Sequence, residues 1–123
     1  MSALPSPEPF YSMTRRAGDL LYLSGFGPVD MQHNVIGVTI EEQTAYTMDA
    51  IKAALASEGA TFDDVVRVNV FLLNMTDRDR FNATYIKYFK DRVPTRRLIG
   101  AGDLFKGILV EIDCVAYVGT GQK

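Results

Sequence analysis

Two segments of the chain alternate apolar and mixed side chains in the way that is typical of β-strands, and a third is a short apolar run. Residues 19–24 form this run, which ends in a turn rich in glycine and proline. In residues 65–73 the even positions, including Val66, are aliphatic, whereas the odd positions include Arg67 and Asn69. Because successive strand side chains point to opposite faces, we expect one core face and one mixed face.

The last strand is predicted within residues 108–118 and has the same two faces. Its even positions are aliphatic or small, and its odd positions include two acids, Glu111 and Asp113. The mixed face is too apolar to lie open to water, although it carries these two carboxylates. We therefore expect another copy of the chain to cover this face, which predicts an oligomer.

Amphipathic helices are predicted on either side of the middle strand. The first begins at Thr39, the N-cap of a capping box that Glu42 completes, and it ends near Gly59. The second begins near Thr76, and Pro94 ends it or begins the next strand. Its apolar stripe recurs at every fourth position, at Phe81, Tyr85 and Phe89.

The order of strands, helix, strand, helix and strands predicts an α+β fold, a mixed sheet with two helices packed on one face. With 123 residues the chain fits a single domain, residues 1–123, with one core. Residues 1–9 carry three of the five prolines, so we expect them to form an extended arm.

Composition and charge exclude several classes of site. The single cysteine, Cys114, and the single histidine, His33, exclude an intramolecular disulfide and any metal site built from several cysteines or histidines. The formal net charge of −2 predicts no broad surface for nucleic acid. No apolar run approaches the roughly 18 residues of a membrane span. The N-terminus lacks the pattern of a signal peptide, so we expect a cytoplasmic protein.

Two charged residues, Arg96 and Glu111, lie in strand-like and otherwise apolar segments. Arg97 follows Arg96 directly, so the two arginines point to opposite sides and at most one enters a given site. Glu111 and Asp113 share a face at a spacing of roughly 7 Å, which suits acid–base chemistry or an interface with arginines. From the pattern alone, surface arginines, a structural salt bridge and a functional site remain open.

Other candidate side chains divide into core, loop and cleft positions. Cys114 lies on the aliphatic face of the last strand, so we expect a small core residue. His33 lies in a polar loop and is expected to be solvated. Ser24 ends a strand before a glycine turn, a position that presents a hydroxyl to a cleft. Tyr11 and Tyr85 fit a core position or a cleft equally well.

Five segments, taken with their order and spacing, resemble the motifs of one family. They are residues 18–25, 42–44, 82–85, 94–96 and 110–113, which read Gly-Asp-Leu-Leu-Tyr-Leu-Ser-Gly, Glu-Gln-Thr, Asn-Ala-Thr-Tyr, Pro-Thr-Arg and Val-Glu-Ile-Asp. From about Tyr11 to Tyr117 the chain resembles the Rid family, the reactive intermediate deaminases that are also called YjgF-like proteins.

The resemblance implies a chorismate-mutase-like α+β fold and a homotrimer whose active sites lie in clefts between subunits. It implies the hydrolysis of reactive enamines and imines, such as 2-aminoacrylate, to 2-keto acids and ammonia, without a cofactor. Arg96 matches the arginine that binds the substrate carboxylate, and Glu111 matches the glutamate that positions or activates water. The further residues of the implied cleft are Tyr11, Ser24, Asn82 and, where the backbone approaches the ligand, Gly25.

The chain departs from the family pattern at four positions: Arg97 replaces a serine, Phe26 a glutamine, Phe105 a proline and Asp113 a glutamate. We expect Arg97 and Phe26 near the cleft, so the choice of substrate stays open. One alternative is a pathway-specific deaminase of the aminomuconate or pyrimidine-breakdown type. Another is a non-catalytic regulatory trimer that binds small carboxylates. A ribonuclease is disfavoured by the acidic balance and the lack of a catalytic histidine.

Overall fold

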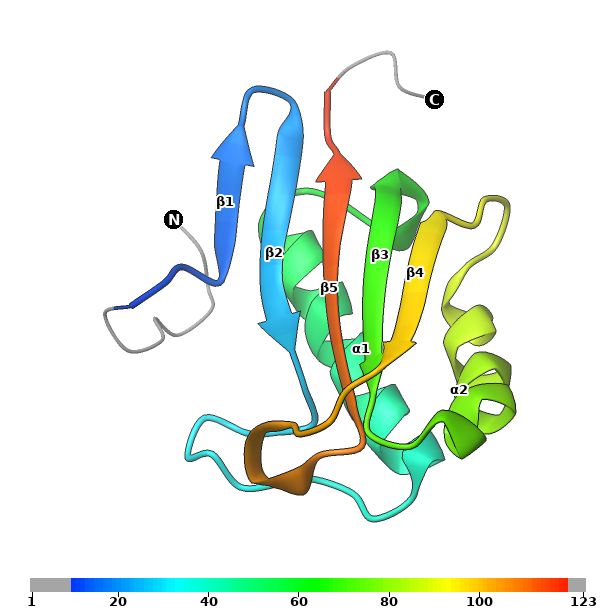
Figure 1. The fold of residues 1–123 in the computed structure, drawn as a ribbon. Coiled ribbons are helices and arrows are strands. Elements are labelled where there is room, and N and C mark those ends of the chain that lie inside the picture. The colour runs from blue at the N-terminus through cyan, green and yellow to red at the C-terminus, as the bar shows by residue number, and fades with distance from the viewer. Residues whose placement is uncertain (1–9, 120–123) are drawn as a thin grey trace.

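The computed structural model describes residues 10–119, which form one five-stranded sheet and two α-helices (Figure 1). Residues 1–9, where the extended arm is predicted, lie outside the described residues. In chain order the elements are β1 (Thr14–Ala17), β2 (Leu20–Phe26), α1 (Ile40–Ser57), β3 (Val65–Leu72), α2 (Arg78–Tyr85), β4 (Thr95–Gly100) and β5 (Val110–Tyr117).

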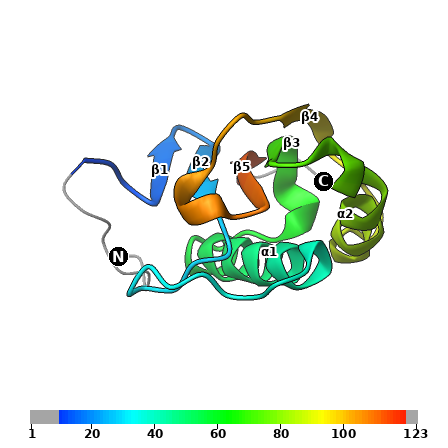
Figure 2. The same ribbon diagram turned by 60° about the horizontal axis from the view of Figure 1, so that its bottom comes forward.

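The strand order across the sheet is β1-β2-β5-β3-β4. All neighbouring strands are antiparallel except β3 and β4, which run parallel because α2 forms the crossover between them. Both helices lie on the same side of the sheet, α2 toward the β4 edge (Figure 2). The predicted mixed sheet with two helices on one face is therefore confirmed.

Strand β5 alternates between the two faces as the sequence predicts. Its even positions are buried in the core that α1 and α2 cover, and Ile112 and Val110 are 1% and 0% exposed. Its odd positions are half-buried on the opposite face, which the helices do not cover. Burial of aliphatic side chains on a single face is what fixes the register of β5 between β2 and β3.

Strand β3 departs from the predicted pattern at its first residues. The prediction placed Val66 in the core, but Val66 is 40% exposed and Val65 is buried instead. The pairing of β3 with β5 shifts between Val65 and Arg67, so a bulge reverses the alternation at this point. From Val68 onward the even positions are buried as predicted.

The first helix begins as the sequence predicts. The Thr39 hydroxyl accepts a hydrogen bond from the Glu42 backbone at 3.1 Å, and the Glu42 carboxylate accepts one from the Thr39 backbone at 3.1 Å. Gly59 follows the helix with a φ of 77°, a left-handed conformation that glycine adopts without strain. Within the helix, buried Gln43 accepts a hydrogen bond from the Leu109 backbone at 2.7 Å and so holds the start of β5.

The second helix begins later than predicted. The expected start near Thr76 falls in a 3-10 helix, Met75–Asp77, and no side chain caps either this turn or α2. Packing and one ion pair hold α2 instead. Arg80 donates two hydrogen bonds, of 2.6 and 2.7 Å, to the carboxylate of Glu41 on α1. The predicted apolar stripe is confirmed, because Phe81, Tyr85 and Phe89 are all buried.

The edge strand β1 is the one strand that the sequence pattern did not predict. Its sequence, Thr-Arg-Arg-Ala, has no alternation of apolar and polar residues, and three of its four side chains are exposed. Pairing with β2 defines this strand, from Thr14 opposite Leu23 to Ala17 opposite Leu20. In the loop that follows β2, Val35 forms a single antiparallel bridge with Val29.

Candidate functional site

The predicted site residues fall into two groups on opposite sides of the sheet. Arg96 on β4 is in register with Val68 on β3, and Val68 is in register with Cys114 on β5. Side chains of paired residues project to the same side of a sheet, and Val68 and Cys114 are both buried in the core. Arg96 therefore points toward the helices.

The guanidinium of Arg96 lies against α2. Its Nη1 donates a hydrogen bond to the Asn82 Oδ1 at 2.8 Å. Its Cζ lies 5.0 Å from the centroid of the Tyr85 ring and 5.9 Å from that of the Phe81 ring, which are cation–π distances. The structure thus brings together two residues that the sequence analysis assigned to the site, Arg96 and Asn82.

Arg96 is half-buried and has no acidic partner within the part of the chain that is described. A guanidinium carries five N–H donors, and one of those of Arg96 is used by Asn82. Positive charge that is partly removed from water ordinarily has a partner. The remaining donors of Arg96 are therefore available to an anion that comes from outside this chain, such as a carboxylate.

Glu111 on β5 belongs to the opposite face. It lies between the core residues Val110 and Ile112 and is in register with Phe71 on β3. Its carboxylate lies against the backbone of Gly25: a methyl group at Gly25 would overlap Oε2 and lie 3.2 Å from Cδ. Only a residue without a side chain leaves this space, so Gly25 and Glu111 fit each other directly.

The surroundings of Glu111 disfavour the ionised form of its carboxyl group. Burial raises the pKa of this carboxyl, and the nearby negative charge of Asp113 raises it further. Asp113 is held by a hydrogen bond from the Asn69 side chain at 2.8 Å, whereas Glu111 has no such partner among residues 10–119. A free carboxyl whose pKa lies above the ordinary range suits a group that exchanges protons.

Ser24 lies beside Gly25 at an irregularity in the pairing of β2 with β5. Its hydroxyl donates a hydrogen bond of 2.5 Å to the Ser12 carbonyl, and its backbone N–H donates one of 2.9 Å to the Met13 carbonyl. These bonds dock the segment that precedes β1, and with it Tyr11, which is 57% exposed. The second group thus contains Ser24, Gly25 and Glu111, with Tyr11 in the adjoining segment.

Two departures from the family pattern occupy different places. Phe26 is 6% exposed and packs in the hydrophobic core, so its side chain points away from the face that carries Glu111. The pairing of β2 with β5 shifts between Leu23 and Phe26, and this irregularity turns the Phe26 side chain toward the core. Arg97 is exposed and in register with Asn69, on the face that carries Glu111.

Cys114 and His33 are placed as predicted. Cys114 is 3% exposed among core residues, and burial raises the pKa of its thiol to about 12. His33 is exposed in a loop, where its backbone carbonyl accepts a hydrogen bond of 2.7 Å from Lys106. Within residues 10–119 no cluster of three or more histidine, cysteine or acidic residues could hold a metal ion. Neither α-helix in this range has the length and hydrophobicity needed to cross a bilayer.

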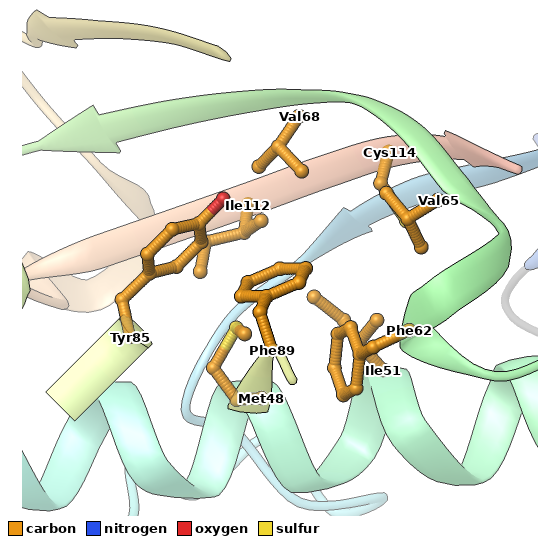
Figure 3. Close-up of a pocket in the computed structure, with 9 residues that line it drawn as sticks. All are labelled: Met48, Ile51, Phe62, Val65, Val68, Tyr85, Phe89, Ile112 and Cys114. Atoms are coloured by element: carbon orange, nitrogen blue, oxygen red, sulfur yellow. The ribbon is translucent and has the colours of Figure 1, made fainter. Parts of the chain in front are cut away.

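The sequence analysis did not identify the aromatic contacts of Arg96. Tyr85 is 5% exposed and forms one wall of a small apolar cavity between the sheet and α1, beside Met48, Phe89 and Cys114 (Figure 3). Its hydroxyl is enclosed and has no partner of hydrogen-bonding geometry in the described chain, and burial raises its pKa to about 12 against the opposing charge of Arg96. The spacing of Phe81, Asn82 and Tyr85 along one helix was the available signal.

Comparison with known proteins agrees with the resemblance noted from the motifs. Residues 1–118 match the family described as Endoribonuclease L-PSP. A RutC family protein of Saccharolobus solfataricus is 42% identical over 113 residues, which cover 91% of this chain and 90% of the relative. The 3-aminoacrylate deaminase RutC of Acinetobacter baylyi is 30% identical, over 93% of this chain and 91% of its own.

The fold agrees with solved structures as well. A crystal structure of a Rid family protein from Yersinia pestis superposes with a TM-score of 0.87 at 33% identity, and the match covers 93% of this chain and 92% of the other. The motifs, the sheet topology and the sequence match extend over nearly the whole chain. The chain therefore belongs to the Endoribonuclease L-PSP family, which is also called the YjgF, RutC or Rid family.

Proposed function

We propose that this protein is a deaminase that hydrolyses reactive enamine and imine intermediates of the 2-aminoacrylate type to 2-keto acids and ammonia. Arg96 binds the carboxylate of the substrate, and Glu111 positions the attacking water. The two residues meet across the boundary between subunits of a homotrimer. Tyr11, Ser24, Gly25 and Asn82 shape the resulting cleft.

The observation that carries this proposal is the state of Arg96. It is half-buried, its guanidinium is fixed by Asn82, and no acid among the described residues neutralises it. A guanidinium in this state is well suited to a bidentate, charge-assisted pair of hydrogen bonds with a carboxylate. A small substrate with a carboxylate satisfies this requirement.

The assembly is supported by the face that the helices leave uncovered. It carries Glu111 together with apolar side chains that are exposed or half-buried, namely Leu20, Tyr22, Phe71, Ile99, Val115 and Tyr117. Contiguous apolar surface of this kind ordinarily marks a contact with another protein. Arg96 and Glu111 point to opposite sides of one sheet, so a single site that uses both needs residues of two chains.

The chemistry requires a tautomerisation, the addition of one water and a proton transfer to the leaving nitrogen. A proton added to C3 of 2-aminoacrylate and one removed from its nitrogen give 2-iminopropanoate. Water then adds to C2, the proton of the new hydroxyl passes to nitrogen, and ammonia leaves with the electron pair of the C–N bond, which gives pyruvate. Glu111, whose pKa is raised by burial, accepts the proton of the water and returns it to the leaving nitrogen.

The relative from Acinetobacter baylyi is named for an enamine of the same kind, since 3-aminoacrylate also carries an amino group on a double bond next to a carboxylate. Its carboxylate and nitrogen are further apart than those of 2-aminoacrylate. Assays with both compounds therefore separate the pathway-specific activity from the general one. The two substrates share a carboxylate, which Arg96 is proposed to bind, and an enamine carbon, next to which Glu111 is proposed to place the water.

A mixing experiment tests the activity and the shared site together. A lyase generates 2-aminoacrylate, and keto acid release is followed for wild type, Arg96→Ala and Glu111→Gln. Each variant alone is expected to lose nearly all acceleration. When the two variants are unfolded together and refolded as mixed trimers, about a quarter of the sites regain both residues from random assembly in a cyclic trimer.

The outcomes of this experiment separate the alternatives. Activity near a quarter of the wild-type value supports a site built by two chains. Active wild type without recovery in the mixture overturns the shared site but leaves the deaminase. Inactive wild type that still binds 2-oxobutyrate by calorimetry points to the regulatory, carboxylate-binding trimer and rejects the deaminase.

A further inference from the structure

Helix α2 makes three contacts with the Arg96 guanidinium. Tyr85 lies three residues after Asn82 and four after Phe81, spacings that place it on the same side of the helix as both. Asn82 accepts a hydrogen bond from Nη1 at 2.8 Å, and the rings of Tyr85 and Phe81 lie 5.0 and 5.9 Å from Cζ. Together these three residues form what we call the arginine socket.

The two rings of the arginine socket are held rigidly by the core. Phe81 and Tyr85 stack on each other at 5.3 Å between centroids and 28° between planes, and Phe89 packs on Tyr85 at 4.9 Å. Phe81 is 0% and Tyr85 5% exposed. Because both rings are buried and packed on neighbouring aromatic side chains, they form an ordered surface against which Arg96 rests.

A guanidinium on a long side chain loses much conformational freedom when it binds a ligand. Contacts that restrict this freedom beforehand reduce the loss that occurs on binding. The arginine socket restricts the Arg96 side chain without a carboxylate. A carboxylate at this place would neutralise Arg96 and compete with an anionic ligand. The ring faces attract the cation, and the Asn82 amide takes one donor and leaves the others available.

We propose that Phe81 and Tyr85 are positioning residues that orient Arg96 for the substrate carboxylate through their ring faces. This inference rests on the proposed function of Arg96 and deepens it. The Tyr85 hydroxyl is enclosed near Arg96 but makes no hydrogen bond of good geometry in the described chain, so we assign the effect to the ring. Removal of the hydroxyl alone therefore leaves the arginine socket intact.

Three variants test this proposal on the full-length protein. Tyr85→Phe keeps the ring, Tyr85→Leu removes it, and Phe62→Leu removes a partly buried ring that packs on Phe89 and has no ring contact with Tyr85 or Arg96. Phe62→Leu is the matched control, since it also costs aromatic packing against the core. The measurements are KM and kcat for 2-aminoacrylate, the Kd for 2-oxobutyrate, and the NMR signals of the Arg96 guanidinium.

Tyr85→Leu is expected to raise KM and the Kd for 2-oxobutyrate about tenfold, within the range of a partly desolvated cation–π contact, and to change kcat less. Rotation about the Nε–Cζ bond of Arg96 becomes faster in this variant. Tyr85→Phe and Phe62→Leu keep both constants within about twofold of wild type and keep the slow rotation.

Unchanged affinity and unchanged Arg96 signals in Tyr85→Leu would overturn the proposal. An equal loss of affinity in Phe62→Leu would also overturn it, because the effect would then come from core packing. These results are independent of turnover. If wild type does not hydrolyse 2-aminoacrylate, the proposed function fails, whereas the rotation of the Arg96 guanidinium still decides whether the arginine socket orients it.

Discussion

Arg96 and Glu111 project from opposite faces of one sheet. Arg96 is in register with the core residues Val68 and Cys114, and Glu111 lies at an alternate position between the core residues Val110 and Ile112. A salt bridge between the two within one chain is therefore excluded. The structure instead holds the guanidinium of Arg96 against α2 at the β4 edge and the carboxyl of Glu111 on the uncovered face.

Replacement of Arg96 by lysine keeps the positive charge but removes the planar fork and the bond to Asn82. We expect KM for 2-aminoacrylate to rise roughly 10- to 100-fold, because a hydrogen bond to a charged group contributes about 1.5–3 kcal/mol. Steady-state kinetics of Arg96→Lys beside Arg92→Lys, an exposed arginine just before β4, provides the comparison. Wild-type KM in Arg96→Lys would mean that charge alone is sufficient.

A methyl group at Gly25 is expected to displace the Glu111 carboxylate without unfolding the protein. The group that must move is the far end of a flexible side chain, since the added carbon overlaps Oε2 and lies 3.2 Å from Cδ. We expect Gly25→Ala to lower kcat/KM at least about tenfold, as removal of a well-placed proton-transfer group does. Circular dichroism checks the fold.

Gly102→Ala is the matched control for this substitution, because a methyl group there meets no atom within 4 Å. Its activity is expected to stay at the wild-type value. If Gly25→Ala is as active as Gly102→Ala, the contact between Gly25 and Glu111 has no part in the reaction.

The sequence pattern predicted most of the fold because the core is one-sided. The alternation in β5 and the Thr39 capping box each follow from local rules, and both are present. The bulge at Val65 and the edge strand β1 were not predictable in this way. Pairing with neighbouring strands, rather than any local pattern of side chains, sets the bulge and defines β1.

The candidate site was predictable only in part for a similar reason. That Arg96 and Arg97 point to opposite sides follows from strand geometry and is confirmed. The contact of Arg96 with Asn82 depends on the parallel crossover through α2, which brings residues 14 positions apart together. The aromatic contacts were concealed because Phe81 and Tyr85 also satisfy the apolar stripe of a core helix.

Removal of the Asp113 charge is expected to move the acid limb of the pH profile to lower pH. The negative charge of Asp113 raises the pKa of Glu111, so Asp113→Asn lowers that pKa and Glu111 stays ionised further into acid. The shift is a few tenths of a pH unit, since two charges roughly 7 Å apart interact by about 0.6 kcal/mol in water.

The measurement is kcat/KM for 2-aminoacrylate between pH 4 and pH 8, with Asp91→Asn as a control that loses an equal charge at an exposed position. Asparagine can still accept the hydrogen bond from Asn69. A profile of Asp113→Asn that coincides with that of the control would show that Glu111 does not titrate in the rate-determining step.

Replacement of Glu111 by glutamine is expected to stabilise the folded protein at neutral pH while it removes activity. The pKa of Glu111 is raised on folding, so the folded state holds this proton more tightly than the unfolded chain does. The stabilising contribution of the protonated form is complete below the ordinary glutamate pKa and is lost as the pH rises through the higher folded pKa. Urea unfolding at one fixed protein concentration should give a higher midpoint for Glu111→Gln than for wild type at pH 7, and the difference should close at pH 4. Equal midpoints at pH 7 would mean that other groups of the assembled protein fully stabilise the ionised carboxylate. Burial of its charge would then not destabilise the folded protein, and a substrate or water would have no such cost to offset.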